Sequence, residues 1–351
     1  MTTNSNTAKV RGKQNGGMIL EGDNLLMVSP LKSSIFKPVQ LRKGFARVGI
    51  CGVPGSGKTK TALEVACGLG KRIALIDTDD RAWMYQRSYE FERGELVDYA
   101  VDSWIEAIYD AEDSGFDVLI LDNFSEAWAG LKGLQEYHQS ILNENKNVDS
   151  FQAWNFVNPL QRKLLDALTM SRLHIVCTFQ AKVEYERILR PDGKTAKLTA
   201  VGYGPVWRSG IEGKFDFFGQ IELENHELRW TKEMFHLFGG ETFQCPTAEL
   251  GARIKAWCDQ GEDGWEFKPT HRVRLIELLK KNQWSNQQVA ELLEMYEISR
   301  FDEVKQYRHY QELRQILSLT AERGFERAEY FTQNKRPTQS KSFLESTGEV
   351  E

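Results

Sequence analysis

The sequence has few of the residues from which metal sites and disulfide frameworks are built. Its five cysteines form no C-x-x-C pair, and its six histidines are scattered without the spacing of metal ligands. Three of the cysteines lie in or beside predicted core elements, which predicts small buried side chains in a reducing compartment. We expect neither a cysteine-based metal centre nor a disulfide scaffold.

Long apolar runs and a strong excess of one charge are also missing. No stretch approaches the ~18 apolar residues that a membrane-spanning helix needs, and the polar N-terminus lacks the apolar segment of a secretory signal. The net charge is −5, so any contact with nucleic acid has to come from a local basic patch. We expect a soluble cytoplasmic protein.

A glycine-rich segment is the clearest feature that the chain does contain. It reads G-V-P-G-S-G-K-T and matches G-x-x-x-x-G-K-T, the loop whose backbone N–H groups surround nucleotide phosphates. We expect Lys58 to reach the β- and γ-phosphates and the Thr59 hydroxyl to bind Mg²⁺. The residues expected to contact the nucleotide are Gly52, Val53, Pro54, Gly55, Ser56, Gly57, Lys58, Thr59 and Lys60.

The segments around this loop have the order that such a site requires. Residues 46–51 are short, apolar and β-branched and predict a strand, whereas residues 60–66 predict a helix. A helix N-terminus directly after the loop would add its dipole to the anion site. The alternative is a glycine-rich turn that matches the pattern by chance.

Three further predicted strands end in polar side chains. Residues 72–77 run into Asp77-Thr78-Asp79, residues 118–122 end in Asp122, and residues 174–180 end in Gln180. Ligands of open α/β sheets bind at the carboxyl ends of the strands. Four apolar residues before Asp122 are typical of the strand whose carboxylate holds Mg²⁺, often through water.

The rest of the chain completes an α/β fold class, with a mainly parallel sheet that ends in an antiparallel hairpin around residues 224–227. Helices are expected at 103–114, 124–143, 150–171 and 247–258, and a long polar loop at 181–214. The expected organisation is an N-terminal extension, 1–44, partly disordered; a core, 45–260; a linker, 261–270; a small helical domain, 271–320, with helices at 271–282, 285–296 and 301–318; and a tail, 321–351, largely disordered.

With these motifs in view, residues 45 to about 258 resemble phage and prophage AAA-type ATP-binding proteins with a RecA-like P-loop core. Related phage proteins with a RecA core act as single-strand annealing proteins. The resemblance rests on the glycine-rich loop, on the strands ending in Asp77-Thr78-Asp79, Asp122 and Gln180, and on the segment 204–216. That segment is similar to the family's P-x-x-R-x-G-x-E-x-x-F-D stretch.

The resemblance implies an activity and partners. It implies Mg²⁺-dependent ATP hydrolysis, with Lys58 and Asp79 as catalytic residues and Asp79 orienting the attacking water. RecA itself has Glu at the corresponding position, and the shorter Asp79 implies slow turnover. It further implies single-stranded DNA as a partner in recombination or replication, a homo-oligomer, and a phage- or prophage-encoded protein whose C-terminal helices contact a replication or recombination protein.

Gln180 would be a third catalytic residue, which senses the γ-phosphate and passes its state to a DNA-binding loop. Such sites combine a basic groove with aromatic side chains that stack on bases, and Tyr203 is a further stacking candidate. Lys232 could act in trans on the ATP of a neighbour. The residues expected to contact DNA are Lys182, Tyr185, Arg187, Arg190, Lys194 and Lys197.

Several alternatives stay open at this point. Asp79 and Asp80 could cap a helix, Gln180 could be a polar strand end, and the basic loop could be a solvated lid. Among the functions, a nucleotide-gated protein-interaction module with negligible turnover and a P-loop small-molecule kinase are the rivals. A last group of side chains favours packing over base stacking: Trp83, Tyr85 and Tyr89.

Overall fold

The computed structural model describes residues 19–21, 24–26, 39–189, 196–262 and 264–333. The chain divides into two compact units, residues 1–41 and residues 42–351. Within the described part of the first unit, β1 (Ile19–Glu21) pairs antiparallel with β2 (Asn24–Leu26).

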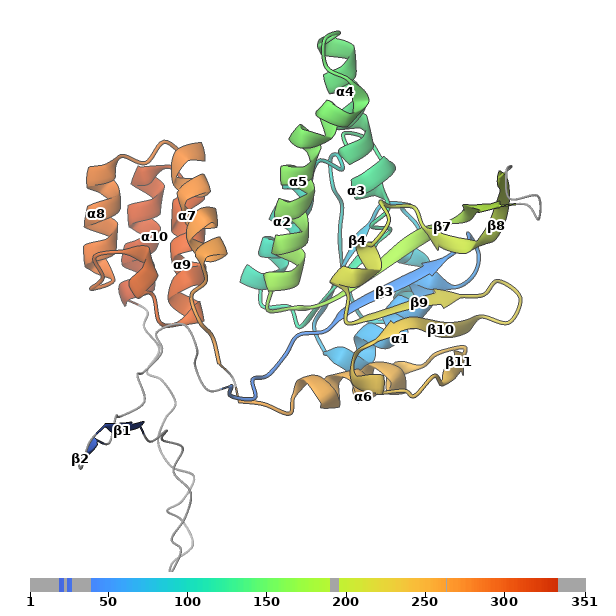
Figure 1. Ribbon diagram of the computed structural model, residues 1–351. Coiled ribbons are helices and arrows are strands. Elements are labelled where there is room, and N and C mark those ends of the chain that lie inside the picture. Colours follow the sequence, from blue (N-terminus) through green and yellow to red (C-terminus); the bar gives the residue numbers. More distant parts are fainter. Residues whose placement is uncertain (1–18, 22–23, 27–38, 190–195, 263, 334–351) are drawn as a thin grey trace, which may run out of the picture. The chain divides into compact units, whose positions relative to one another are not determined.

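A sheet of nine strands forms the centre of the second unit (Figure 1). Its order is β11-β10-β9-β3-β7-β6-β4-β5, and β8 pairs with β7 outside this row. Strands β9 to β5 of this row run parallel, whereas β10, β11 and β8 join by antiparallel pairing. This confirms the expected sheet. The strands are β3 (Arg47–Gly52), β4 (Ile73–Asp77), β5 (Glu92–Gly94), β6 (Val118–Asp122), β7 (His174–Leu189), β8 (Ala196–Pro205), β9 (Phe217–Ile221), β10 (Glu227–Glu233) and β11 (Thr242–Gln244).

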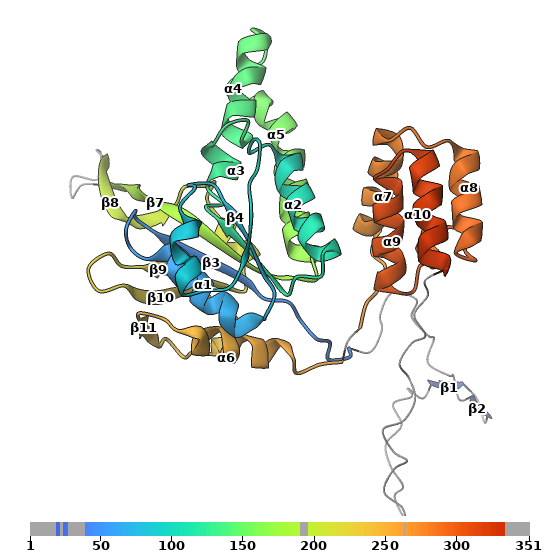
Figure 2. The same cartoon turned by 180° about the vertical axis from the view of Figure 1, so that it is seen from behind.

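Helices cover both faces of this sheet, as the views from the front and from behind agree (Figures 1 and 2). One face packs on α1 (Lys58–Leu69) and α6 (Ala248–Cys258), and the other on α2 (Val101–Asp113) and α5 (Ser150–Met170). Alternate side chains of β6 enter the two apolar clusters, because successive residues of a strand point to opposite faces. Burial on both faces explains why all five residues of this strand are buried.

The helix expected at 124–143 is broken in two. α3 (Glu126–Ala129) and α4 (Leu134–Glu144) are separated by a turn that contains Gly130 and Gly133. A Cβ atom on Gly133 would lie 2.9 Å from the carbonyl oxygens of both Glu126 and Gly130. The backbone of this turn therefore leaves no room for a side chain at position 133.

Residues 264–333 contain four α-helices around their own apolar cluster, which includes Leu275, Trp284, Leu292 and Leu313. They are α7 (Pro269–Lys281), α8 (Asn286–Met295), α9 (Tyr307–Leu317) and α10 (Ala321–Gln333). The third helix begins later than expected, after the short turn η4 (Phe301–Glu303).

The expectation of a largely disordered tail from residue 321 is wrong for residues 321–333, which form α10. Phe325, Ala328 and Phe331 recur at helical spacing and pack into the apolar cluster of the four helices. Within the expected linker, Trp265 and Phe267 pack against the same cluster. Burial of these apolar side chains therefore stabilises two segments whose overall composition is polar.

Two expectations from composition can be placed on the fold. Cys51, Cys177 and Cys258 are buried, whereas Cys67 and Cys245 are exposed, and all five thiols are free. No helix in the described ranges combines the length and apolar character needed to cross a membrane.

Arg47 fastens the amino-terminal edge of the sheet to the end of α5. Its guanidinium is buried and donates to the carbonyl oxygens of Leu168 (2.5 Å) and Leu173 (2.7 Å), and also to that of Ser171. The last carbonyls of a helix have no partner within the helix, so the arginine supplies the missing donors. Burial lowers the pKa of Arg47.

His174 lies at the same edge and generates a prediction of acid sensitivity. The side chain is buried, Nδ1 accepts the Ala46 N–H (3.0 Å), and burial lowers its pKa from 6.5 to about 4. In the unfolded chain the imidazole binds a proton below its ordinary pKa, whereas in the fold it stays neutral until about pH 4. The contribution of neutral His174 to the free energy of unfolding is therefore fully present above pH 6.5 and is lost as the pH falls toward 4.

We expect the wild type to lose about 2 kcal/mol more unfolding free energy between pH 7 and pH 5 than His174→Asn, whose amide oxygen keeps an acceptor without titrating. Urea denaturation at the two pH values measures this difference. Equal losses in the two proteins would contradict the assigned pKa.

Candidate nucleotide-binding site

The glycine-rich loop lies between β3 and α1, so the expected order of strand, loop and helix is confirmed. Gly55 (φ 84°) and Gly57 (φ 96°) adopt left-handed backbone conformations, which glycine reaches without strain. Gly57 is also the N-cap of α1. The loop therefore ends at the positive end of a helix dipole, where an anion is stabilised.

The Lys58 ammonium lies over this loop and donates to the carbonyl oxygen of Val53 (3.0 Å). Burial lowers the pKa of Lys58, while the nearby carboxylates of Asp122 and Asp79 act in the opposite direction. The three side chains therefore share one electrostatic environment, although they come from α1, β6 and the turn after β4.

The Asp122 carboxylate joins three elements. Its Oδ2 accepts the Thr59 hydroxyl of α1 (2.6 Å), and its Oδ1 accepts the Thr178 hydroxyl of β7. Only 8% of the residue is exposed. Burial raises the pKa of Asp122, and the two hydroxyl donors counteract that shift.

The donors at this place suit a magnesium ion. A hydroxyl and a carboxylate are hard oxygen ligands, and Mg²⁺ is commonly held by one or two carboxylates together with substrate phosphates and water. Throughout the described ranges there is no group of three or more His, Cys, Asp or Glu side chains that could hold a metal alone. The residues therefore fit an ion that arrives with a nucleotide.

Asp77 shapes the turn after β4. Its carboxylate accepts the N–H groups of Asp79 (3.2 Å) and Ala82 (2.8 Å) and pairs with Arg93 (3.1 Å). Asp80 pairs with the same arginine. Asp77 therefore accepts the first N–H of the turn that follows (η1, Ala82–Arg87).

Glu126 is a second carboxylate in this region that sequence reasoning missed. It lies in α3, four residues after Asp122, and accepts a long hydrogen bond from the Asn123 amide (3.5 Å). Burial raises the pKa of Glu126, and the charge of Asp79 raises it further. The only sequence signal was a glutamate shortly after the strand that ends in Asp122.

Gln180 lies beside Gly52 in the parallel pairing of β7 with β3. Its N–H donates to the Ser125 hydroxyl (3.0 Å), and its carbonyl accepts the Val206 N–H (2.7 Å). The backbone of Gln180 is thus tied both to the turn after Asp122 and to the residue that follows β8.

The expected loop at 181–214 is wrong over much of its length, because β7 continues past Gln180 and pairs with β8 as a long hairpin (Figure 1). Lys182, Val183, Tyr185 and Tyr203 are all exposed. Residues 182–185 are exposed on both faces of this ribbon, so this part of the sequence lacks the apolar alternation that marks a strand packed on a core.

The residues expected to contact DNA fall unequally on this hairpin. Val183 pairs with Tyr203 and Tyr185 with Ala200, with a register shift between the two pairs, and both tyrosines are exposed, Tyr185 by 59% and Tyr203 by 54%. The Lys182 ammonium donates to the carbonyl oxygen of Trp207 (2.8 Å). The backbones of Arg187 and Lys197 belong to the paired strands. Two others, Arg190 and Lys194, lie outside the described residues.

The aromatic segment after Asp79 has two parts. Tyr85 and Tyr89 pack against the apolar cluster of α1 and α6, and the Tyr89 hydroxyl donates to Glu64 (2.7 Å). Trp83 is exposed. Packing therefore accounts for both tyrosines.

The segment 204–216, one of the motifs of the family resemblance, packs into the fold. Trp207 and Phe215 are buried, and the Asp216 carboxylate accepts the Arg47 N–H (2.8 Å). Lys232 donates to the carbonyl oxygen of Gly213 (3.0 Å) in the same chain.

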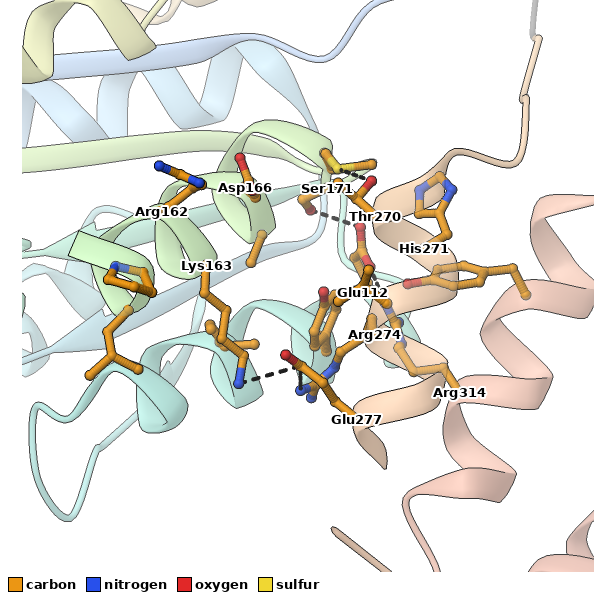
Figure 3. A pocket seen from close by; sticks show the side chains of 18 of the residues that line it. Glu112, Arg162, Lys163, Asp166, Ser171, Thr270, His271, Arg274, Glu277 and Arg314 are labelled. Carbon is orange, nitrogen blue, oxygen red and sulfur yellow. Dashed lines mark hydrogen bonds and ion pairs between the residues drawn. The ribbon is translucent and has the colours of Figure 1, made fainter. Parts of the chain in front are cut away.

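A cavity of about 570 Å³ lies away from the phosphate loop, lined by α2 and α5 on one side and by α7 and α9 on the other (Figure 3). Four of its charges form two pairs: Glu112 accepts from Arg314 (2.8 Å), and Glu277 pairs with Lys163 (3.3 Å). None of the polar strand ends contributes to its lining.

The fold and the loop define a P-loop nucleotide-binding site. A family model described as an AAA domain matches residues 45–272, and the chain belongs to this family. The search of curated proteins found no match. Among solved structures, a crystal structure of the RadB recombinase is similar over 55% of this chain and 84% of that chain, with 16% sequence identity and a TM-score of 0.34.

Proposed function

We propose that the chain binds Mg–ATP at the phosphate loop, hydrolyses it slowly and couples the nucleotide state to single-stranded DNA on the β7–β8 hairpin. One observation carries the proposal. Strand β7 passes the phosphate loop at Gln180 and continues without interruption into the exposed hairpin. The resemblance to phage RecA-core proteins favours a role in recombination or replication.

The residues divide the work as follows. Lys58 and the loop N–H groups would bind the β- and γ-phosphates, and Thr59 with Asp122 would hold the ion, which neutralises charge on the transferring phosphoryl group. Asp79 would orient the attacking water. The Gln180 side chain, beside Gly52 at the carboxyl end of β3, would respond to the γ-phosphate.

The hairpin has the side chains that single-stranded DNA requires. Tyr185 and Tyr203 offer exposed rings for stacking, and the lysines and arginines of the segment would contact phosphates. This supports binding without base preference, with an affinity that falls steeply as salt rises.

A nucleotide-gated protein-interaction module is the second candidate. The four helices α7 to α10 form a unit with its own core, as an interaction domain would, and Asp79 is short for a water-orienting residue. A small-molecule kinase has less support, because the exposed hairpin and the added helices fit it poorly.

Steady-state ATP hydrolysis by the full chain, with and without Mg²⁺ and single-stranded DNA, tests the proposal. We expect turnover that requires Mg²⁺ and responds to DNA. Lys58→Ala should lose ATP binding while remaining folded, whereas Lys71→Ala, at an exposed position after α1, should bind like the wild type. Undiminished ATP binding by Lys58→Ala would refute the central assignment, and binding without turnover would favour the interaction module.

The two carboxylates near the phosphate loop can be separated by isosteric amides. We expect Asp79→Asn to bind ATP normally but to lose at least ~100-fold in kcat, the typical contribution of a positioned general base. Glu126→Gln should retain more activity, and Asp80→Asn, which removes an exposed partner of Arg93, is the matched control. Wild-type turnover by Asp79→Asn together with an inactive Glu126→Gln would assign the water to Glu126.

DNA binding is measured by fluorescence anisotropy of a labelled oligonucleotide with ATP, with ADP and without nucleotide, at two salt concentrations. Tyr185→Ala/Tyr203→Ala should weaken binding by about tenfold or more, because each base stack contributes ~1–3 kcal/mol. Tyr137→Ala, on α4, is the matched control.

Lys182→Ala/Arg187→Ala/Arg190→Ala should reduce the salt dependence of DNA binding, and Gln180→Ala should make DNA affinity independent of nucleotide. Absence of DNA binding in every state would exclude the recombination role.

A further inference from the structure

The turn between β9 and β10 packs directly against the phosphate loop. β9 pairs in parallel with β3, so the two segments that leave their carboxyl ends lie side by side. A Cβ atom on Gly52 would lie 2.7 Å from Cγ2 of Ile221, and one on Gly55 would lie 3.6 Å from Cδ1 of Leu223. The segment from Ile221 to Leu223 thus lies directly against the phosphate loop.

His226 makes a polar contact between this turn and the phosphate loop. Its Nδ1 lies 2.8 Å from the carbonyl oxygen of Ser56, and since a carbonyl can only accept, Nδ1 is the donor. The ring also lies against Gly57, where an added Cβ would be 3.4 Å from Nδ1. The bond joins residues that are far apart in the sequence, on the two segments described above.

The direction of this hydrogen bond fixes the direction of a neighbouring donor. A trans peptide is planar, and its C=O and N–H point to opposite sides. The Ser56 carbonyl points toward His226, so the N–H of Gly57 points away from the turn. Backbone N–H groups that face inward are what make this kind of loop an anion site.

We propose that His226 is a positioning residue for phosphate binding, which holds the Ser56–Gly57 peptide so that the Gly57 N–H faces the nucleotide phosphates. The inference rests on the proposed nucleotide binding and adds a residue that the loop motif does not contain. His226 is itself held in place, because its carbonyl accepts the Cys245 N–H (3.1 Å) at the end of β11.

The backbone of His226 sets the choice of variants. Its φ is 54°, in the left-handed region that glycine and asparagine tolerate best. His226→Gly removes the donor and suits the backbone, whereas His226→Asn suits the backbone and keeps an N–H donor near the position of Nδ1. His236 is a matched control, because it has a similar φ of 49° and an exposed side chain whose Nδ1 lies 3.8 Å from Glu233.

The experiment measures ATP-analogue binding by calorimetry and the KM and kcat of hydrolysis for the wild type, His226→Gly, His226→Asn, His236→Gly and Lys58→Ala. We expect His226→Gly to raise the Kd and KM about 3- to 10-fold, the effect of one net hydrogen bond, with little change in kcat. His226→Asn should restore most of the affinity, and His236→Gly should match the wild type. The ligand-free melting temperatures of the two glycine variants should be similar.

The outcomes separate this inference from the proposed function. Wild-type affinity in His226→Gly, or equally weak binding by His226→Gly and His226→Asn, would overturn the role of His226. The proposed function would stand in either case if the wild type binds ATP and Lys58→Ala does not. A wild type that binds no ATP would overturn both.

Discussion

The buried carboxylate of Asp122 is the interaction on which the site depends. It receives one hydroxyl from α1 and another from β7, and so it joins the phosphate loop, the strand that carries it and the strand that leads to the hairpin. A buried carboxylate is costly unless it is hydrogen-bonded. The hydroxyl groups of the two threonines supply these hydrogen bonds. An ion bound with nucleotide phosphates would compete with them for the carboxylate oxygens of Asp122. A change in the position or charge of this carboxylate therefore alters the hydrogen bonds of both Thr59 and Thr178.

A second buried charge network links the sheet domain to the C-terminal helices. Glu112 of α2 accepts from Arg314 of α9 and from the Ser171 hydroxyl (2.8 Å; Figure 3). The Arg314 guanidinium lies 4.1 Å from the ring centre of Tyr109. Removing one partner of such a pair leaves an uncompensated buried charge, which typically costs about 3–5 kcal/mol. The pair therefore favours one arrangement of α2 and α9 over a loose tether.

The parts of the site that could be predicted from sequence are those whose geometry is local. The glycine-rich loop specifies its own backbone conformation, and the Ser285 capping box is present at the start of α8. His226 could not be predicted, because its proximity to the loop follows from the pairing of β9 with β3, and no motif marks Glu126 in the turn and helix after Asp122. The hairpin could not be predicted for a different reason, since its residues 182–185 are exposed on both faces and have no apolar period to detect.

The same topology explains how a nucleotide could act on the hairpin without a long mechanical path. Phe124 follows the Asp122 strand, Phe179 precedes Gln180, and Trp207 follows the second hairpin strand. Their rings form one buried cluster, in which Phe124 stacks on Trp207 at 5.0 Å and meets Phe179 edge-on at 5.9 Å. Close-packed interiors transmit small shifts because they leave little free volume. A displacement of the turn after Asp122 would therefore reach both strands of the hairpin at their base, through the aromatic cluster and through the hydrogen bond from Gln180 to Ser125.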